Sequence, residues 1–392
     1  MPWSQTSPMD QRVQFIADYL RDSLSMVELC ASYGISRKTG YKWIDRYLRH
    51  GPQGLEERSR RPQRNPNQTP AKIEAAIIQA RQRHPSWGAK KLLQLLATRH
   101  PHWPWPARST ACEILKRNGL VISKKRRRVI GHPGKPSTDV RGANDLWCAD
   151  YKGQFKTGNG IYCYPLTITD TYSRYILCCQ SLTGTRLKDA KAVFTRIFKE
   201  YGLPQRMRTD NGTPFASYSL ARLSRLSAWW VRLGVIPEFI EPGKPQQNGK
   251  HERMHRTLKD ETTKPPARNL QAQQRKFNRF VTEFNQLRPH EALDMATPGS
   301  LYQPSGREMP NKIPPLEYPD RFVTRRVSGN GGMRWHHQWV CVSMACAGEY
   351  VGLEEIDNGV WNVFFGPLKL GRFHERLLRI EDDYGRLKRH NK

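Results

Sequence analysis

The sequence lacks the features that mark a membrane or secreted protein. No stretch of the 392 residues approaches the run of about eighteen apolar residues that a membrane-spanning helix needs. The N-terminal residues MPWSQTSPMDQR contain no apolar core of the kind found in secretory signal peptides. We therefore expect a cytoplasmic protein with no membrane partner.

Cysteine pairs are also missing. The chain has 8 cysteines but no Cys-x-x-Cys motif, and the gap between Cys341 and Cys346 does not match half of a zinc site. Cys163, Cys178 and Cys179 lie in apolar runs, which favours buried thiols in a reducing compartment. A structural zinc site is therefore not expected.

Acidic residues are scarce relative to basic ones. The chain has 65 Lys+Arg against 35 Asp+Glu, a net charge of +30 and a pI near 10.1. Such an excess favours a polyanionic partner, and nucleic acid fits best. The length allows two or three domains.

Three carboxylates stand out against this basic background. Asp150 and Asp210 each follow a short apolar run that is typical of a strand, so a sheet would hold both rigidly. Glu252 follows the turn PGKPQQNG, after which a helix can begin. Helical spacing places three further polar residues on the face of Glu252: Asn248, Arg256 and Lys259.

If these carboxylates converge, they offer hard oxygen ligands for two Mg²⁺ or Mn²⁺ ions about 4 Å apart, as used for in-line displacement at phosphorus. The alternative for Glu252 is a solvated helix with an ordinary ion pair between Glu252 and Arg256. The motifs around the three acids weigh against that alternative.

Three motifs carry a family resemblance. They are Trp147-x-x-Asp150, Thr209-Asp210-Asn211-Gly212 and Pro245-Gln246-x-Asn248-Gly249-x-x-Glu252-Arg253. Together they resemble the catalytic blocks of the DDE core of the retroviral-integrase type, and above all those of prokaryotic insertion-sequence transposases. One departure is the 41 residues between Asp210 and Glu252, longer than is usual in that superfamily. We expect the additional residues to lengthen a helix at Leu220 to Leu233.

The resemblance implies a site and its partners. Asp150, Asp210 and Glu252 would be the catalytic residues and the ligands of two Mg²⁺ or Mn²⁺ ions. Arg256 and Lys259 would hold phosphates of the terminal DNA, and Asn248 would orient backbone near the site. Double-stranded DNA, a homo-oligomer of two or more copies and association with the nucleoid follow by the same inference. Asp170, Asp260 and Glu261 are excluded from the catalytic set.

The N-terminal residues 1–62 are expected to form a helix-turn-helix domain. Ser25 and Glu28 match a capping box, Gly34 marks a turn, and Ser36 can cap a second helix. That helix would turn basic residues toward a DNA groove: Arg37, Lys38 and Lys42. The alternative is a plain helical hairpin, since this pattern also arises by chance. The zinc module found at this end of retroviral integrases is missing from the sequence.

Residues 63–123 predict a second helical domain, with helices in AKIEAAIIQARQRH, SWGAKKLLQLLATRH and STACEILKRNG. Trp103 and Trp105 are expected to serve packing rather than base stacking. Residues 124–143 read as a basic linker that contacts phosphate. Its basic run comprises Lys124, Lys125, Arg126, Arg127 and Arg128.

Residues 144–300 predict the α/β catalytic core. Three strands in a meander, followed by alternating helices and strands, are the order of the ribonuclease-H-like fold. A long helix is expected at Leu270 to Leu287, followed by the motif RPHEAL. His290 in that motif is as consistent with a structural role as with DNA contact.

Residues 320–380 contain short β-rich runs separated by glycines, which predicts a small β-barrel. The resemblance implies that this barrel is SH3-like. The alternative is a generic β-sheet interaction module. In either case we expect this part of the chain to bind rather than to react.

The sequence therefore predicts a DDE transposase or integrase. It would bind the terminal repeats of a mobile element, cleave at the 3′ ends and join them to target DNA by two-metal phosphoryl transfer. Two alternatives stay open: a DNA-binding transcriptional regulator derived from a transposase, and a purely hydrolytic nuclease of the same fold.

Overall fold

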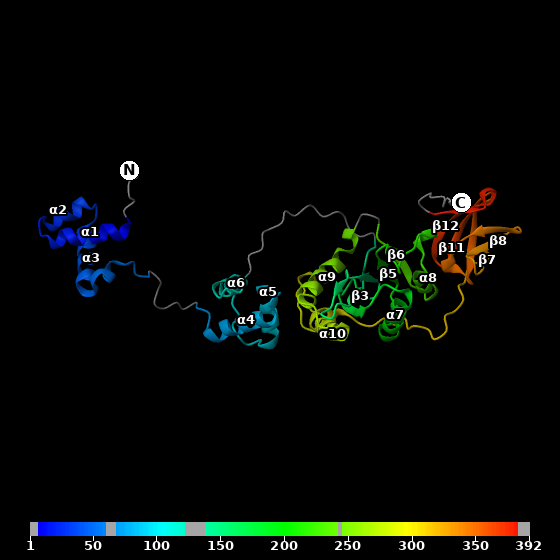
Figure 1. Cartoon of the computed structure of the whole chain (residues 1–392), viewed down its shortest axis with the longest axis horizontal. Coiled ribbons are helices and arrows are strands. Elements are labelled where there is room, and N and C mark those ends of the chain that lie inside the picture. The colour runs from blue at the N-terminus through cyan, green and yellow to red at the C-terminus, as the bar shows by residue number, and fades with distance from the viewer. Residues whose placement is uncertain (1–6, 60–67, 122–137, 242–244, 383–392) are drawn as a thin grey trace. The chain divides into compact units, whose positions relative to one another are not determined.

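A computed structural model describes residues 7–59, 68–121, 138–241 and 245–382 (Figure 1). Its internal contacts divide the chain into two units, Met1–Gln68 and Thr69–Lys392, and each is described by itself. None of the helices in the described ranges is long and apolar enough to cross a membrane.

Unit 1 contains the helices α1 (Pro8–Leu20), α2 (Met26–Ser32) and α3 (Arg37–His50), followed by the 3₁₀ turn η1 (Gly51–Leu55). The predicted capping box is present. The Ser25 hydroxyl oxygen accepts a hydrogen bond from the Glu28 backbone N–H, and the Glu28 carboxylate accepts one from the Ser25 backbone N–H. Gly34 takes φ +62° in the turn between α2 and α3, a conformation that favours glycine.

Close packing of α2 against α3 completes the helix-turn-helix. Leu29, Trp43 and Ile44 are buried between the helices of this unit. A Cβ atom on Gly40 would lie 2.6 Å from the Met26 methyl group, so α3 approaches α2 closely only because this position has no side chain. Unit 1 therefore has a core of its own.

Unit 2 begins with the helices α4 (Ala71–Arg83), α5 (Ala89–Arg99) and α6 (Arg108–Arg117). Apolar side chains of these helices surround Trp87, which is 1% exposed. Trp103 and Trp105 pack against this cluster, which confirms their predicted packing role.

The central sheet of unit 2 has the ribonuclease-H-like arrangement. Its strands are β1 (Leu146–Tyr151), β2 (Phe155–Lys156), β3 (Tyr162–Asp170), β4 (Ile176–Leu182), β5 (Arg206–Thr209) and β6 (Ile236–Phe239). The order is β2-β3-β1-β5-β6, with β4 also pairing with β3. β3 runs antiparallel to β1 and β4, whereas β5 runs parallel to β1 and β6.

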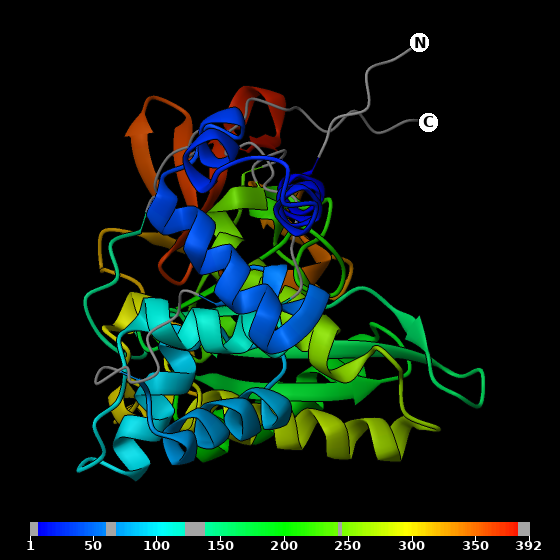
Figure 2. The same cartoon turned by 90° about the vertical axis from the view of Figure 1, so that its left-hand side faces the viewer.

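Helices cover both faces of this sheet. α7 (Leu187–Tyr201) and α8 (Arg225–Arg232) pack against Trp147, Ala149 and Met207 on one face. α9 (Gly249–Thr262) and α10 (Leu270–Gln286) pack on the other face, and α10 runs alongside β4 (Figure 2). Because side chains alternate along a strand, Asp150 lies on the face covered by α9.

The segment between Asp210 and Glu252 corrects one prediction. It holds the short turn η2 (Leu220–Arg222) and the eight-residue helix α8, not one long helix over Leu220 to Leu233. Ala221 and Arg222 take positive φ of 49° and 56°, which ends the turn, and Ser224 then caps α8. The additional residues therefore form a structured loop.

This loop anchors the C-terminal region. Its Leu220 and Leu223 belong to one buried cluster with Val351, Val363 and Phe365. The strands that follow the core are β7 (Val323–Arg326), β8 (Gly332–Trp335), β9 (Gln338–Cys341), β10 (Tyr350–Asp357), β11 (Val360–Phe365), β12 (Leu368–His374) and β13 (Arg379–Glu381).

These strands form a sheet in the order β13-β12-β11-β10-β7 and a separate β8-β9 ribbon. Strands β7 and β13 stand at the two ends of the larger sheet and do not pair with each other within the described residues. The β-rich character was predicted correctly, but a closed SH3-like barrel is not confirmed.

Shorter turns complete unit 2. They are η3 (Pro245–Asn248) before α9, η4 (Glu291–Leu293) and α11 (Pro298–Leu301) after α10, and η5 (Met344–Cys346) and η6 (Glu375–Leu377) in the C-terminal region. In the 290 region, the His290 ring packs edge-on against Phe284 at 4.7 Å between centroids, and burial lowers the pKa of His290 to about 3. His290 is thus a half-buried residue that packs against the core and whose lowered pKa favours the neutral form.

Candidate active site

Asp150 lies near the end of β1, at the point where the central strand leaves the sheet. Its side chain is 21% exposed, so it sits at the border between the protein interior and solvent. The neighbouring Trp147 and Ala149 are fully buried in the α7 side of the core and fix the strand in place.

Asp210 follows β5, the parallel neighbour of β1. The register pairs Ala149 with Thr209, so Asp150 and Asp210 are the next residues at the same end of two adjacent strands. The Gly212 backbone N–H donates to the Asp210 carboxylate at 3.1 Å, which holds the turn after the strand. The topology therefore brings the two aspartates together.

Glu252 comes from the first turn of α9 and faces the same place. A cavity of about 410 Å³ is lined by Asp150 and Glu252 and by Tyr151, Lys152, His255, Arg256 and Lys259. The structure thus brings Asp150, Glu252, Arg256 and Lys259 into one site. Asp210 is not part of that lining, but its charge and that of Glu252 both act on Asp150.

The electrostatics of Asp150 follow from this crowding. Burial, which is the largest cause, and the negative charges of Asp210 and Glu252 together raise the pKa of Asp150 to about 7. The positive charge of Lys152 lowers this pKa, but it does not offset the effect of burial and of the two acids. Oxygen ligands with unbalanced negative charge are the set that Mg²⁺ and Mn²⁺ prefer, so these residues fit a divalent ion.

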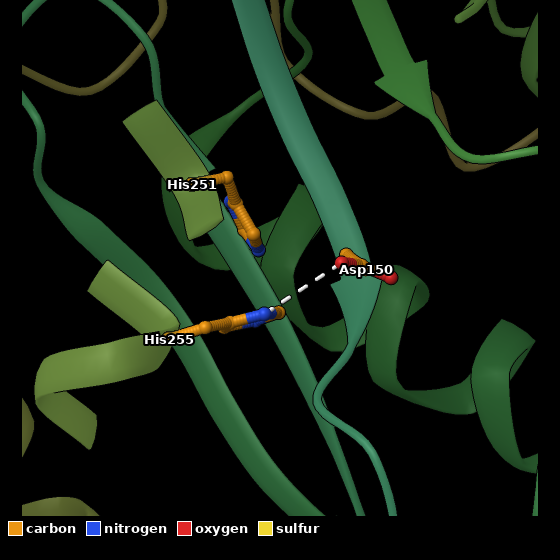
Figure 3. A group of neighbouring side chains, drawn as sticks. All are labelled: Asp150, His251 and His255. Carbon is orange, nitrogen blue, oxygen red and sulfur yellow. Dashed lines mark ion pairs between the residues drawn. The ribbon is translucent and has the colours of Figure 1, made fainter. Parts of the chain in front are cut away.

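Two buried histidines of α9 also reach the site, and the sequence reasoning missed them. The Nδ1 atom of His255 lies 3.6 Å from Oδ2 of Asp150, and the two side chains point toward one another in Figure 3. His251 lies one turn earlier, and ligand atoms of Asp150, His251 and His255 all lie within 4.8 Å of one another. The signal was available as a His pair at i and i+4 flanking Glu252.

Asn248, which was predicted to orient backbone near the site, lies just before α9. It is 5% exposed, and its Oδ1 atom has no hydrogen-bond partner among the described residues. The buried Arg208, on β5, donates to the Gln247 carbonyl at 3.3 Å and pairs with Glu238 at 2.6 Å. These contacts tie the turn before α9 to the sheet.

The predicted DNA-binding residues of unit 1 lie on α3. Arg37, Lys38 and Lys42 are all exposed on this helix, and the Lys42 ammonium also lies 4.3 Å from the centroid of Trp43. The predicted basic run, Lys124 to Arg128, lies outside the described residues.

The acids that were excluded from the site have partners of their own. Buried Asp170 accepts hydrogen bonds from the Asn144 and Ser173 backbone N–H groups at 2.8 and 2.7 Å, and so closes the turn between β3 and β4. Asp260 pairs with Lys264 at 2.9 Å. Glu261 pairs with Arg288 at 2.7 Å, more than two turns along α9 from Glu252.

Comparison with known families agrees with this arrangement. Residues 140–245 and 233–298 match the integrase core domain. Residues 11–63 match a helix-turn-helix domain, and residues 39–115 match a homeodomain-like domain.

Insertion-element proteins are among the relatives. The IS476 39.2 kDa protein of Xanthomonas euvesicatoria is 27% identical over 60% of this chain and 66% of its own length. The IS407 31.7 kDa protein of Burkholderia multivorans is 28% identical over 47% of this chain and 61% of its own length. The chain therefore spans at most 66% of the length of these two relatives. A radiation murine leukemia virus Pol polyprotein is 31% identical over 35% of this chain and 21% of its own length.

Two solved structures are also similar. The HTLV-2 integrase catalytic core domain, in complex with magnesium, has 18% identity and a TM-score of 0.34, and covers 42% of this chain and 100% of that chain. A chain in the cryo-EM structure of the simian T-cell lymphotropic virus intasome in complex with PP2A regulatory subunit B56 gamma has 15% identity and a TM-score of 0.35, and the match covers 75% of this chain and 97% of that chain. The chain therefore carries an integrase core domain with helix-turn-helix domains before it, and these matches support a prokaryotic insertion-sequence transposase of the integrase superfamily.

Proposed function

We propose that the protein is a DDE transposase that binds the terminal repeats of a mobile element, cleaves at the 3′ ends and joins these ends to target DNA. The observation that carries this proposal is the convergence of Asp150, Asp210 and Glu252, held by two strands and a helix, beside a cavity that is also lined by basic side chains. Carboxylates at such a site can bind metal cations, and the basic side chains beside them can bind the phosphates of a polyanionic substrate.

The three carboxylates would hold two Mg²⁺ or Mn²⁺ ions, which activate the attacking oxygen and stabilise the leaving oxygen when they are bound. The protein's part is to keep the acids in place before DNA arrives. Asp150 and Asp210 are fixed by paired strands and Glu252 by a helix buried along its other side. Rigid placement of this kind lowers the cost of assembling the reactive geometry.

Basic residues at the cavity would position DNA. Arg256 and Lys259 lie one and two turns beyond Glu252, both are exposed, and both line the cavity together with Lys152. Cations in this position can hold the phosphates on either side of the reacting one, while the reacting phosphate faces the carboxylates. Buried Asn248 would serve by fixing the turn before α9 rather than by direct contact.

The N-terminal units would recognise the ends of the element. We assign residues 1–62 and 63–123 as the two DNA-binding domains and residues 124–143 as a basic linker that includes Lys124 to Arg128. In the first domain Arg37, Lys38 and Lys42 are exposed on α3 and would face the major groove. Contacts of this kind select sequence, whereas the basic linker adds affinity for any DNA.

The remaining regions complete the proposal. Residues 144–300 would be the catalytic core and residues 320–380 an SH3-like binding module that also contacts DNA or a second copy of the chain. Joining two ends in concert needs two active sites, so the working form would be a dimer or a larger homo-oligomer. It would act in the cytoplasm on the DNA of the nucleoid.

The test uses the purified full chain, Mg²⁺ or Mn²⁺ and labelled DNA from the flanks of its own gene. Glu252→Gln keeps the size of the side chain and removes its charge, so we expect cleavage to be lost while DNA binding stays within a few-fold of the original protein. Unchanged cleavage by this variant would show that Glu252 is not in the active site. Cleavage without joining would favour a nuclease, and binding without either product a regulator.

A further inference from the structure

Beneath Asp150 lies a buried polar network that connects β3 to α9. The Thr167 hydroxyl oxygen lies 2.8 Å from Nε2 of His251 and 2.6 Å from Nε2 of His255. The Thr169 hydroxyl lies 2.8 Å from Nδ1 of His251. All four side chains of this network are at most 7% exposed. Asp150, whose side chain is 21% exposed, lies next to His255 at the end of the network that is nearest to solvent.

The network does not have the form of a closed metal site. Three of the four imidazole nitrogens already contact threonine hydroxyls, which leaves Nδ1 of His255 as the open one. A cation bound by Asp150 and both histidines would have to break at least one of these hydrogen bonds. The arrangement instead resembles the hydrogen-bonded partners that orient a metal ligand from behind.

Hydrogen-bond accounting limits the tautomers along the network. Both imidazoles are buried, at 2% and 5% exposed, and their hydrogen-bond partners among the described residues are threonine hydroxyls, so both rings are neutral. Each ring therefore carries one N–H. The Thr169 hydroxyl can donate to Nδ1 of His251, so that Nε2–H of His251 donates to Thr167.

The Thr167 hydroxyl has a single hydrogen and two neighbours that can accept it: Nε2 of His255 and the Asp150 carbonyl oxygen at 3.0 Å. Donation to the carbonyl would leave a bare Nδ1 lone pair of His255 facing the Asp150 carboxylate at 3.6 Å. Donation to Nε2 of His255 places an N–H on Nδ1 instead, and that dipole attracts the carboxylate. The second arrangement is therefore favoured whenever Asp150 is ionised.

We propose that His255 is a positioning residue that orients the Asp150 carboxylate through its Nδ1–H group, with Thr167 and His251 setting its tautomer from behind. The inference rests on the proposed function, in which Asp150 is a metal ligand. The contact of 3.6 Å is longer than a hydrogen bond and acts electrostatically. It would restrain the Oδ2 atom of Asp150, a residue that lines the cavity shared with Glu252.

Two nearly isosteric variants separate this role from simple packing. The amide nitrogen of His255→Asn occupies the place of Nδ1 and keeps the donor to Asp150. The amide of His255→Gln reaches the place of Nε2 and keeps only the contact with Thr167. If His255 merely fills space or satisfies Thr167, glutamine replaces it better than asparagine. If it positions Asp150, asparagine replaces it better.

The experiment measures the binding of Mn²⁺ alone to the full chain. The electron paramagnetic resonance signal of free Mn²⁺ reports how much of the ion remains unbound. We expect His255→Gln to weaken Mn²⁺ binding by about 10- to 100-fold, the usual effect of losing a group behind a metal ligand, and His255→Asn to stay within a few-fold of the original protein. Circular dichroism checks that both variants are folded. Equal affinities, or weaker binding by the asparagine variant, would overturn the proposal.

Asp150→Asn serves as the reference for the metal site itself. If this variant binds Mn²⁺ as tightly as the original protein, the proposed metal ligands are wrong. The positioning role of His255, which depends on them, is then refuted as well. If Asp150→Asn loses binding and His255→Gln does not, only the role of His255 is refuted. Should neither His255 variant fold, Thr167→Val tests the same network, with an expected several-fold loss of Mn²⁺ affinity; unchanged affinity would refute it.

Discussion

The raised pKa of Asp150 makes a prediction about stability that needs no DNA. Without metal, the folded protein holds this carboxylate beside Asp210 and Glu252, so its ionisation opposes folding. We expect Asp150→Asn, which removes the charge and keeps the shape, to stabilise the metal-free protein at pH 8. The same residue would then be required for activity and unfavourable for stability, as is common at active sites.

The magnitude follows from the shift. The pKa rises from 3.8 in an unfolded chain to about 7 in the folded protein, a difference worth about 4 kcal/mol at most. The side chain is 21% exposed, so solvent screening reduces this to about 2 to 4 kcal/mol. In a domain of this size that corresponds to a rise in melting temperature of roughly 5 to 15 °C.

The sign of the pH dependence is fixed by the direction of the shift. A carboxyl group whose folded pKa is raised favours the folded state while it is protonated, and this benefit is lost as the pH rises from about 4 to about 7. The advantage of Asp150→Asn should therefore be less than half as large at pH 5 as at pH 8, where it is complete. Saturating Mn²⁺ at pH 8 should reduce it, because the ion stabilises only the original protein.

The assay is thermal unfolding of the full chain in the presence of a chelator, followed by tryptophan fluorescence at pH 5 and at pH 8. Asp260→Asn is the matched control, because Asp260 is an exposed acid on the surface of α9 and should change stability by no more than about 0.5 kcal/mol. An equal effect of Asp150→Asn at both pH values, or no effect at pH 8, would refute the electrostatic account of the site.

Three further predictions concern the supports of the site. Arg208→Met should destabilise the protein by about 3 to 5 kcal/mol in chemical denaturation, because it removes the ion-pair partner of Glu238. The double variant that also carries Glu238→Leu should recover much of this loss of stability. A double variant that is no more stable than Arg208→Met would argue against the buried pair. Leu223→Ala should cost about 2 to 5 kcal/mol and speed proteolysis of residues 323–381, while unchanged proteolysis would show that the loop does not anchor the C-terminal sheet. Lys259→Gln should lower the slope of log affinity for DNA against log salt by about 1, and an unaltered slope would exclude a phosphate contact.

The sequence carried the main elements of the core because local patterns decide them. The apolar periodicity of residues 187–201 predicts the bounds of α7. The apolar run before Asp150 lies in β1, which continues to Tyr151, and the run before Asp210 ends with β5 at Thr209. Helical spacing also placed Glu252, Arg256 and Lys259 on one face of α9, and all three line the same cavity.

The sequence could not supply what depends on packing between distant segments. His251 and His255 on α9 contact Thr167 on β3, which lies more than eighty residues earlier in the chain. These side chains meet only because α9 packs on the face of the sheet that carries Thr167. The loop at Leu220 was predicted as part of a lengthened helix because the interval between Asp210 and Glu252 is longer than usual in the superfamily. Its apolar residues face the C-terminal sheet instead, which no local pattern reveals.

The predicted closure of the C-terminal strands into a barrel is not confirmed, and the limit of the sequence is similar here. Short β-rich runs between glycines indicate strands but not which strands pair. In the structure β10 to β13 form a meander, and β7 joins the β10 edge, so the ends of the sheet stay apart within the described residues. Pairing between distant strands is decided by register and packing, which composition does not encode.

The central claim is that this carboxylate site joins a DNA 3′ end to a second DNA, and one joining assay tests it most directly. The full chain, Mg²⁺ and a supercoiled target plasmid are mixed with a labelled, already cleaved end of the element that carries either a 3′-hydroxyl or a 3′-dideoxy terminus. Our account predicts joined product only with the 3′-hydroxyl end and none with Glu252→Gln. Joining by the Glu252→Gln variant, or from the dideoxy end, would contradict it.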